Sequence, residues 1–556
     1  MDFKEFFYIS KLTCKAFTTK ERYGILVLTL FFVFSLFNLI FAGGEKEIFN
    51  IDENIYVEGF IGEIGVLNPL FSGLNSVDND ITKLIFQGLS RYDSSTAEVI
   101  DNEKIATHTL NVDQKEYTFY INPNAKWHDN EALTADDIIF TYRDVIQNPQ
   151  FPNIVLQDSF KEVEITKIDQ YTVKFTLPTK NSFFFTNTLV GLLPKHIWQD
   201  VPIAEIQTSS LNQFPIGNGP YKFDSMIRNN DLSRIQLSRY EEYSDKKSNI
   251  SKISFVIFPN FEALKKNISM INGVAGLSKS EVDEIYDERF SFYQYILPRY
   301  TALFINTDRP ILKNKKMRLA LQKALDKKQI VNEMGYDFVV DTPLLELQTE
   351  QWSFQSNIEE AKGALFDEGW KLNEKTSLRE NTNGETLSLR LLTKRYDEGS
   401  QQEIMNEKLI SLIKDQLKAV GVDLQIESYP FNFLQYLILD RDYDLLLYGQ
   451  SLGYNLDLYS YLHSGQSKGR GLNLSSYRNV RVDQLIEDVR GTFDEETKQE
   501  KLKRIGDILA NDIPAIYLFT PTYYYIVDKK IDIGDLGKLA TPADRFEGIC
   551  EWEKEN

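Results

Sequence analysis

The sequence predicts an α/β protein of two or three domains, preceded by one apolar segment of membrane length. The chain has 556 residues, which is enough for more than one domain and for a large core. From residue 55 onward, strand-like apolar runs alternate with segments of helical periodicity, as is typical of α/β architecture. Hydrophobic residues make up 42% of the chain and aromatic residues 13%, which indicates a folded protein.

The charge and the cysteine content exclude several kinds of function. A formal net charge of −19 opposes binding to nucleic acid, whose phosphates would be repelled, and opposes adhesion to anionic lipid. The two cysteines, Cys14 and Cys550, stand on opposite sides of the apolar segment, so we expect neither a disulfide framework nor a cysteine metal site. No cysteine stands directly after that segment to carry a lipid anchor.

The apolar segment at residues 23–42 predicts export. It is long enough to cross a bilayer core of about 30 Å. Five Lys or Arg residues precede it against three acids, which places residues 1–22 in the cytoplasm and the rest outside. A cleaved signal sequence is the alternative, because Ala42-Gly43-Gly44 offers small residues, but its apolar core would be about 7–15 residues. Residues 43–54 then form a polar tether.

The stretch from Ala125 to Ile146 carries the strongest local signals. A strand at Tyr117–Ile121 ends in the turn Asn122-Pro123-Asn124. Thr134 is a predicted N-cap with Asp137 as its capping-box partner, and apolar residues keep helical spacing as far as Ile146. This pattern predicts a strand, a loop and one helix with a buried face.

His128 and Asp129, in the loop before that helix, have the residue types of a catalytic base and its orienting partner. Adjacent side chains rarely point at one another, however, and the sequence ties no Ser or Cys nucleophile to this pair. A Trp in a capped turn is usually a packing residue. We therefore expect Trp127 to be buried and the loop to be structural.

Further elements follow in alternation. Gly217 and Gly219 permit a tight backbone path before a strand. Arg318 lies in a helix that we predict to reach Ile330, and we expect it to be structural. The other predicted helices are 77–89, 357–369 and 403–420, the last two closed by Gly369 and Gly421. The other predicted strands are 55–61, 163–168, 171–177, 253–258, 299–307, 422–426 and 444–448.

Several of these segments carry motifs in a fixed order, and with them the chain resembles the extracellular solute-binding proteins of family 5, which feed peptides, nickel and related solutes to ABC importers. The first motif includes Asn130 where the family has Gly, and Asn tolerates a left-handed backbone. The motifs are KWHDNEALTADD at 126–137, PIGNGPY at 215–221, RYTALFINT at 299–307, GYNLDLYSYLHSG at 453–465, GLNLSSY at 471–477 and DIPAIYL at 512–518.

The resemblance implies the type II fold of periplasmic binding proteins, in which two α/β lobes joined by a hinge close on a solute. The first lobe would comprise residues 55–92, 215–298 and 512–556, with a small subdomain at 93–214. The second lobe would comprise residues 299–511. Two strand crossings between the lobes are what a hinge requires.

The same resemblance places the ligand site around residues 453–465. Asn455, Leu456 and Leu458 depart from the family's Asp-Pro-Asp-Pro pattern, so only Asp457 is left to pair with the terminal ammonium of a peptide. If Asp457 points outward, an amine-bearing peptide is no longer the favoured ligand. The expected ligand contacts are Asp457, Tyr454, Asn455, Tyr459, His463, Asn75 and Asn218. We expect His463 to line the pocket and not to bind a metal, because the chain has four His and no second one lies within ligand spacing.

The implied function is the extracytoplasmic solute-binding component of an ABC importer, which captures oligopeptides and delivers them to a membrane permease. No Walker A sequence is present, so ATP hydrolysis would belong to another chain. We expect a monomer without cofactor or metal. The alternatives are a binder of another solute, such as an oligosaccharide or metal chelate, and a membrane-tethered sensor. A hydrolase is disfavoured because no nucleophile, metal or paired-acid constellation is visible.

Overall fold

The computed structural model describes residues 55–228, 232–243, 250–285 and 287–555. By its contacts the chain divides into residues 1–55 and residues 56–556, and the second unit is the one described below. The predicted N-terminal segments at 1–22, 23–42 and 43–54 lie outside the described residues. Within the described ranges, no helix has both the length and the apolar character to cross a membrane.

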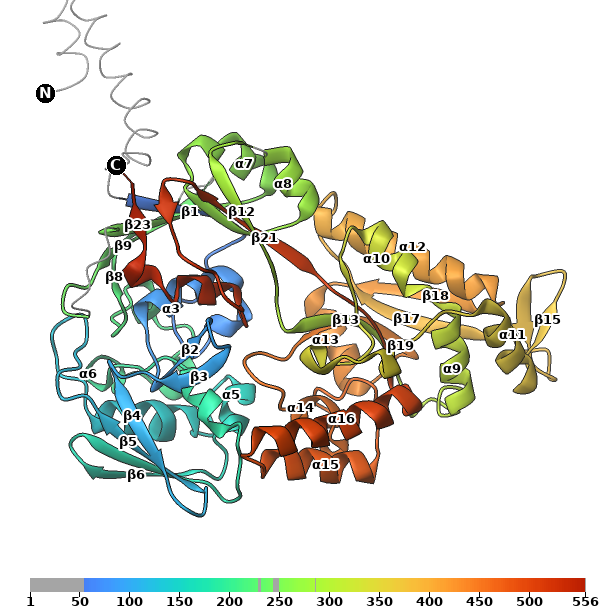
Figure 1. Cartoon of the computed structure of the whole chain (residues 1–556), viewed down its shortest axis with the longest axis horizontal. Helices are drawn as coiled ribbons and strands as arrows, with labels where there is room; N and C mark the ends of the chain where they lie inside the picture. The colour runs from blue at the N-terminus through green and yellow to red at the C-terminus, as the bar shows by residue number, and fades with distance from the viewer. Residues whose placement is uncertain (1–54, 229–231, 244–249, 286, 556) are drawn as a thin grey trace, which may run out of the picture. The chain divides into compact units, whose positions relative to one another are not determined.

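Two sheets and the elements packed with them form what we call the first lobe (Figure 1). Along its seven-stranded sheet the strands are β12 (Phe290–Ile296), β21 (Thr522–Asp528), β11 (Gly273–Leu277), β1 (Ile55–Ile61), β10 (Lys252–Phe258), β9 (Ser233–Arg239) and β8 (Tyr221–Arg228). Along its four-stranded sheet they are β4 (Ala106–Leu110), β5 (Glu116–Ile121), β7 (Thr172–Thr176) and β6 (Glu164–Asp169). One buried hydrophobic cluster runs through both sheets.

The first lobe also contains short helices and two small strand pairs. The strand pairs are β2 (Ser90–Asp93) with β3 (Glu98–Asp101), and β22 (Ile531–Asp532) with β23 (Glu553–Lys554). The helices are α3 (Ser76–Ile85), α4 (Ala135–Ile139), η2 (Phe140–Ile146), α5 (Ile154–Ser159), α6 (Lys195–Trp198), α7 (Phe261–Lys266), α8 (Lys279–Ile285) and the 3-10 turn η10 (Pro542–Phe546).

A six-stranded sheet with helices on both faces forms what we call the second lobe (Figure 1). Its strands in spatial order are β14 (Phe338–Val339), β20 (Ala515–Thr520), β13 (Arg299–Ile305), β19 (Leu445–Ser451), β17 (Ser388–Lys394) and β18 (Asp423–Tyr429). One face packs against α9 (Lys315–Ala324), α10 (Lys327–Met334), α11 (Ile358–Asp367) and α12 (Gln401–Ala419). The other face packs against α13 (Phe431–Asp440), α14 (Tyr459–Leu462), α15 (Val480–Arg490) and α16 (Glu495–Asp512). A hairpin, β15 (Lys371–Asn373) with β16 (Leu378–Glu380), completes it.

The capped stretch at 125–146 confirms most of its prediction and corrects one point. Thr134 caps α4, and the Asp137 carboxylate accepts a hydrogen bond from the Thr134 backbone N–H at 2.9 Å. Trp127 is fully buried, and Asn130 has the left-handed φ of 72° that its position requires. The α-helix ends at Ile139 and continues to Ile146 as a π-helix, whose wider turn keeps Tyr142 and Val145 buried.

The tight path predicted at Gly217 and Gly219 is confirmed. A Cβ on Gly217 would lie 1.9 Å from the carbonyl oxygen of Ile85, and one on Gly219 would lie 2.3 Å from that of Leu84. Both positions therefore exclude any side chain. The close approach is fixed by a hydrogen bond of 2.8 Å from the Gly219 N–H to the Ile85 carbonyl.

Two predictions in the second lobe are corrected. The helix expected to reach Ile330 is two helices, because Leu325 leaves the helical conformation and Asp326 caps the next helix by accepting from the Gln329 N–H. Residues 512–520, which were assigned to the first lobe, belong with the second, because β20 pairs with β13 and β14. The chain therefore crosses between the seven-stranded sheet of the first lobe and the six-stranded sheet of the second lobe at 297–298 and at Pro521.

Arg318 has the structural role that was predicted. Its guanidinium is buried and donates hydrogen bonds to the backbone carbonyls of Leu312 and Lys313 at 2.9 Å and of Ile513 at 3.0 Å. These bonds tie α9 to the end of α16. All the acceptors are backbone groups of the second lobe, so this arginine serves packing.

Candidate functional site

Tyr454 joins the two lobes. It lies in the loop after β19 of the second lobe, and its hydroxyl donates to the Asp544 carboxylate of the first lobe at 2.9 Å. The same oxygen lies 3.1 Å from the Thr541 hydroxyl, and the ring packs on Tyr92 with 5.0 Å between centroids. Burial holds the Tyr454 pKa well above its ordinary value, so this hydroxyl stays a hydrogen-bond donor.

Asp457 is held by Arg490, the last residue of α15. The guanidinium donates to both carboxylate oxygens, with Nη2 2.7 Å from Oδ2 and Nε 3.0 Å from Oδ1. The backbone carbonyl of Arg490 accepts the Ser182 N–H of the first lobe at 2.7 Å. Both oxygens of the one acid retained in the motif are therefore occupied, and its partner is a second contact between the lobes.

The other residues of this loop stack on that ion pair. The Arg490 guanidinium carbon lies 3.9 Å from the centroid of the Tyr459 ring, and His463 stacks on the opposite side with 4.3 Å between centroids. His463 Nε2 lies 3.3 Å from a Glu487 oxygen. Asn455 accepts a hydrogen bond from the Asp457 N–H at 2.9 Å, which shapes the turn. The structure thus brings together Asn455, Asp457, Tyr459 and His463, whereas Tyr454 from the same loop contacts the first lobe.

Asn75 and Asn218 lie elsewhere in the first lobe. The Asn75 side chain caps α3 by accepting from the Val77 N–H at 2.9 Å, and its amide donates to the Glu63 carbonyl. Asn218 is buried and bonds both the N–H and the carbonyl of Gln87. Both side chains have structural partners inside the chain, and the ligand contacts expected of these seven residues stay predictions.

Sequence reasoning missed a cluster at one edge of the six-stranded sheet. The pairing register places the start of β13 at the same end of the sheet as the last residues of β17, β18, β19 and β20. We call this the crossing edge, because the chain leaves it toward the first lobe at 297–298 and at Pro521. It carries Arg299, Tyr336, Lys394, Tyr396 and Tyr448, with Tyr523 of the first lobe against it. Its signal in the sequence was the tyrosine-rich segment TYYY at 522–525, which follows the crossing at Pro521.

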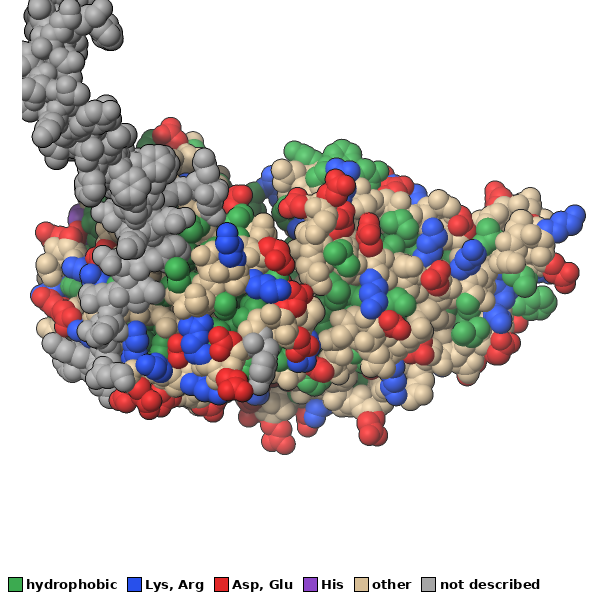
Figure 2. Space-filling view, turned by 90° about the horizontal axis from the view of Figure 1, so that it is seen from above, with side chains coloured by type: hydrophobic (Ala, Val, Ile, Leu, Met, Phe, Trp, Pro, Cys, Tyr) green, Lys and Arg blue, Asp and Glu red, His purple; other side chains and the backbone are tan. Residues whose placement is uncertain are grey.

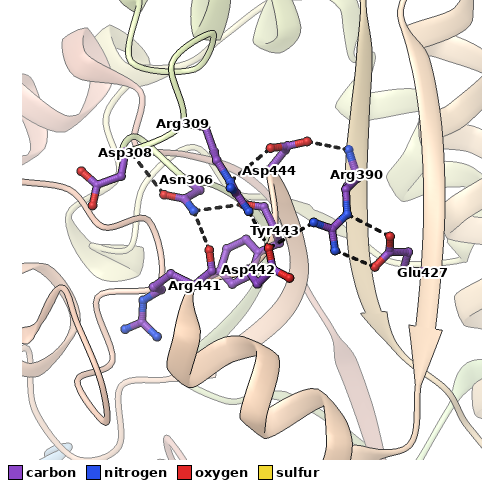
Figure 3. Close-up of polar contacts among 9 residues, drawn as sticks. All are labelled: Asn306, Asp308, Arg309, Arg390, Glu427, Arg441, Asp442, Tyr443 and Asp444. Carbon is purple, nitrogen blue, oxygen red and sulfur yellow. Dashed lines mark hydrogen bonds and ion pairs between the residues drawn. The ribbon is translucent and has the colours of Figure 1, made fainter.

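The opposite edge of the same sheet holds a network of ion pairs (Figure 3). Asp442 accepts from Arg309 at 2.9 Å and from Arg390 at 3.1 Å. Arg390 also binds both oxygens of Glu427, at 2.9 and 3.0 Å, and its backbone N–H donates to Asp444 at 2.9 Å. We call these five residues the paired edge, because each of its charged groups has an opposite charge within reach.

The first lobe encloses a second ionic cluster. Arg545 is fully buried and donates to Glu58 at 2.7 Å and to Asp80 at 2.6 Å. Burial is the largest influence on both acids, raising the pKa of Glu58 and raising that of Asp80 to about 6. Arg545 neighbours Asp544, so the segment that receives Tyr454 is anchored in this core.

His128 and Asp129, which have the residue types of a catalytic base and its partner, make structural contacts. His128 bonds the Gly219 carbonyl at 3.0 Å and accepts from the Gly217 N–H at 3.2 Å, while Asp129 pairs with His196 at 2.8 Å. Burial lowers the His128 pKa to about 4, so the ring is neutral at physiological pH. Among the described residues, no group of three or more His, Cys, Asp or Glu side chains is placed to hold a metal ion.

Comparison with known proteins places the chain among solute-binding proteins. The family model described as bacterial extracellular solute-binding proteins, family 5 Middle, matches residues 102–472. The oligopeptide-binding protein AppA of Bacillus subtilis is 25% identical over 496 residues, which cover 86% of this chain and 88% of that protein.

Solved structures share the fold. AppA from Bacillus subtilis in complex with a nonapeptide has a TM-score of 0.73 at 24% identity, covering 90% of this chain and 99% of that one. NikZ from Campylobacter jejuni in complex with Ni(L-His) has a TM-score of 0.74 at 23% identity, covering 91% of this chain and all of that one. The α/β fold of the periplasmic binding proteins is thereby established for this chain.

Proposed function

Because the chain belongs to the bacterial extracellular solute-binding proteins of family 5, we propose that it captures oligopeptides between its two lobes and delivers them to the permease of an ABC importer. The observation that carries this proposal is the pair of contacts with the first lobe made by Tyr454, in the loop after β19, and by Arg490 of α15, which binds Asp457 of that loop. A solute that touches both lobes stabilises the arrangement in which these contacts form. The permease then receives the loaded, closed form.

Peptides are the proposed solute because several relatives are named for them, among them AppA and the periplasmic oligopeptide-binding protein OppA of Salmonella typhimurium. Backbone groups along an extended peptide supply affinity that tolerates different side chains. Asp457, Tyr454, Asn455, Tyr459 and His463 are proposed to line the site, and Tyr454 and Asp457 also hold the loop in place. We keep Asn75 and Asn218 as proposed contacts from the first lobe.

The proposed setting is the extracytoplasmic face of the membrane. Residues 23–42 would anchor the chain, or would be removed as a signal sequence and leave it free outside the membrane. The proposed partners are permease subunits with separate ATPase subunits, and the proposed state is a monomer that does no chemistry on its solute. Figure 2 shows acidic and basic side chains interspersed over one face, so the excess negative charge is not gathered there into a patch that would select a basic partner.

One observation favours a different solute. Both Asp457 oxygens are bound by Arg490, so the ammonium group of a peptide would have to displace an existing ion pair. A solute without an amine, such as an oligosaccharide or a metal chelate, would meet no such competition. The structure of NikZ with Ni(L-His) is an example of the fold holding a metal chelate.

The test is to purify the full-length protein in detergent and identify its ligand by native and then denaturing mass spectrometry. We expect short peptides bound at one per chain. Tyr454→Phe, which removes the hydroxyl that bonds Asp544, should lose this ligand faster during buffer exchange. The matched control is Tyr443→Phe, whose hydroxyl bonds the Leu474 carbonyl within the second lobe. Purification with a sugar or a metal chelate, and no peptide, would reject peptide capture and retain the family assignment.

A further inference from the structure

The crossing edge contains a cation that lacks the partners found by similar cations elsewhere. Arg299 is half-buried, and its guanidinium stacks on the Tyr523 ring with 4.4 Å from its central carbon to the centroid. Burial lowers its pKa, and the groups that oppose this effect are the hydroxyls of Tyr295 and Tyr336. In the part of the chain that the structure describes, no carboxylate pairs with Arg299 and no carbonyl accepts from its side chain.

Three buried arginines among the described residues have hydrogen-bond acceptors for their side chains. Arg379 donates to the carbonyls of Trp370 and Val420, each at 2.7 Å. Arg545 has two carboxylates, and Arg318 has backbone carbonyls. A guanidinium carries five N–H donors, and removing them from water without acceptors costs free energy. Arg299 differs from these three, because no described group accepts from its half-buried side chain and none of its nitrogens is both buried and without a partner, so they stay open to solvent or to a ligand.

The surroundings of Arg299 are aromatic. Tyr523 stacks on the guanidinium, and the Tyr336 hydroxyl interacts electrostatically with it. Side chains alternate along β13, which puts Arg299 on the face of the sheet that packs against α9–α12. Lys394 lies on the other face, over the Phe431 ring of α13 at 5.7 Å. Arg299 therefore supplies a positive charge on its own face at this end of the sheet, where it attracts an anion, and the Tyr336 hydroxyl is a further hydrogen-bond donor.

Building on the proposed function, we infer that Arg299 binds a carboxylate of the captured solute, with Tyr523 holding the guanidinium in place. The planar fork of an arginine matches the two oxygens of a carboxylate, which a lysine cannot do equally well. A peptide supplies this group at its C-terminus or on an acidic side chain. A non-peptide acid supplies the same chemistry.

The inference is tested by calorimetric titration of the full-length protein in detergent with matched probes. The peptide probes are Ala-Phe-Ala-Phe-Ala as the free acid, the same peptide as its C-terminal amide, and Ala-Phe-Glu-Phe-Ala amide. The non-peptide pair is gluconate and glucose. We expect the wild-type protein to prefer the free acid over the amide by about tenfold, the size of one charge-assisted contact.

The variants assign this preference to one residue. Arg299→Gln should reduce it to about twofold by weakening the free acid alone, and Arg299→Lys should retain part of it. Arg478→Gln removes an exposed arginine that pairs with Asp308 and should leave the preference unchanged. Thermal unfolding of each variant shows whether it is folded, and the lysine variant keeps the test open if the glutamine variant is not.

The outcomes separate this inference from the proposed function. Equal binding of acid and amide by the wild type, or an unchanged preference in Arg299→Gln, rejects the inference and leaves peptide capture standing. Binding of gluconate over glucose that depends on Arg299, without peptide binding, keeps the inference and rejects peptide capture. Tight binding of the Glu-containing amide identifies an acidic side chain as the source of the carboxylate. Failure of every carboxylate to bind rejects the inference.

Discussion

The arginines at the paired edge and at the crossing edge of the six-stranded sheet have opposite kinds of surroundings. At the paired edge, Arg309 and Arg390 share Asp442, and Arg390 also holds Glu427 in a two-pronged contact. At the crossing edge, Arg299 stacks on an aromatic ring, and no carboxylate among the described residues pairs with it. The two edges belong to the same strands and differ in what they face. Stability is served by closed networks of charge, whereas recognition needs a charge whose partner is brought by another molecule.

The largest expected effect is on stability at the paired edge. Asp444→Ala removes an acceptor from the Arg390 N–H and a carboxylate 3.3 Å from Arg309, and we expect a loss of about 2 kcal/mol in the free energy of unfolding. Arg299→Leu should change this free energy by less than about 1 kcal/mol, because it removes an unpaired charge. Urea unfolding measures both. Equal losses in the two variants would abolish the distinction between the edges.

The second-largest expected effect comes from giving Arg299 a carboxylate partner within the chain, like those of the arginines at the paired edge. Tyr523→Glu puts a carboxylate where the ring now lies under Arg299, so the cation becomes paired within the chain. We expect the affinity for the free-acid peptide to fall about tenfold, which corresponds to about 1.4 kcal/mol. Tyr523→Gln, which is neutral and of similar size, is the control and should lose less. Calorimetric titration measures both, and similar losses in the two variants would show that the ring matters and the charge does not.

The smallest effect is a pH dependence confined to the paired edge. Hydrogen bonds from Arg390 and Arg309 lower the Asp442 pKa, and those from Arg390 lower the Glu427 pKa. A folded-state pKa below the unfolded value means that the stabilisation is present above about pH 4 and is lost as pH falls further. The difference in unfolding free energy between the wild type and Asp442→Asn should be under about 1 kcal/mol at pH 7 and should shrink as the pH falls below about 4. A difference that does not shrink on acidification contradicts this origin.

The sequence predicted what is decided by neighbours along the chain. The Thr134 cap, the buried Trp127 and the left-handed Asn130 follow from local chemistry, and the family resemblance supplied the two-lobed α/β fold. The placement of β20 did not follow, because its continuous apolar run suits a buried strand of either sheet. Only pairing with β13, some 200 residues earlier, assigns it to the second lobe.

The sequence singled out the loop at 453–465 as the candidate site, and it did not predict the contacts that hold this loop. The motif at 453–465 brought Tyr454 and Asp457 to attention, but their partners Asp544 and Arg490 lie far along the chain. Arg299 was missed for a different reason. Its distinguishing property is the absence of a carboxylate among the described residues around it, and that is a property of the folded whole.

The position of Arg545 in the first lobe has a consequence for the order in which the protein is made. The chain begins this lobe with β1 and returns to it only after Pro521, when β21 enters the sheet between β11 and β12 and Arg545 reaches Glu58 and Asp80. A ribosome that has released fewer than about 545 residues has not yet supplied the strand or the cation that this core is built around. The first lobe therefore begins first and is completed last, so its core can close only when nearly the whole chain has been made.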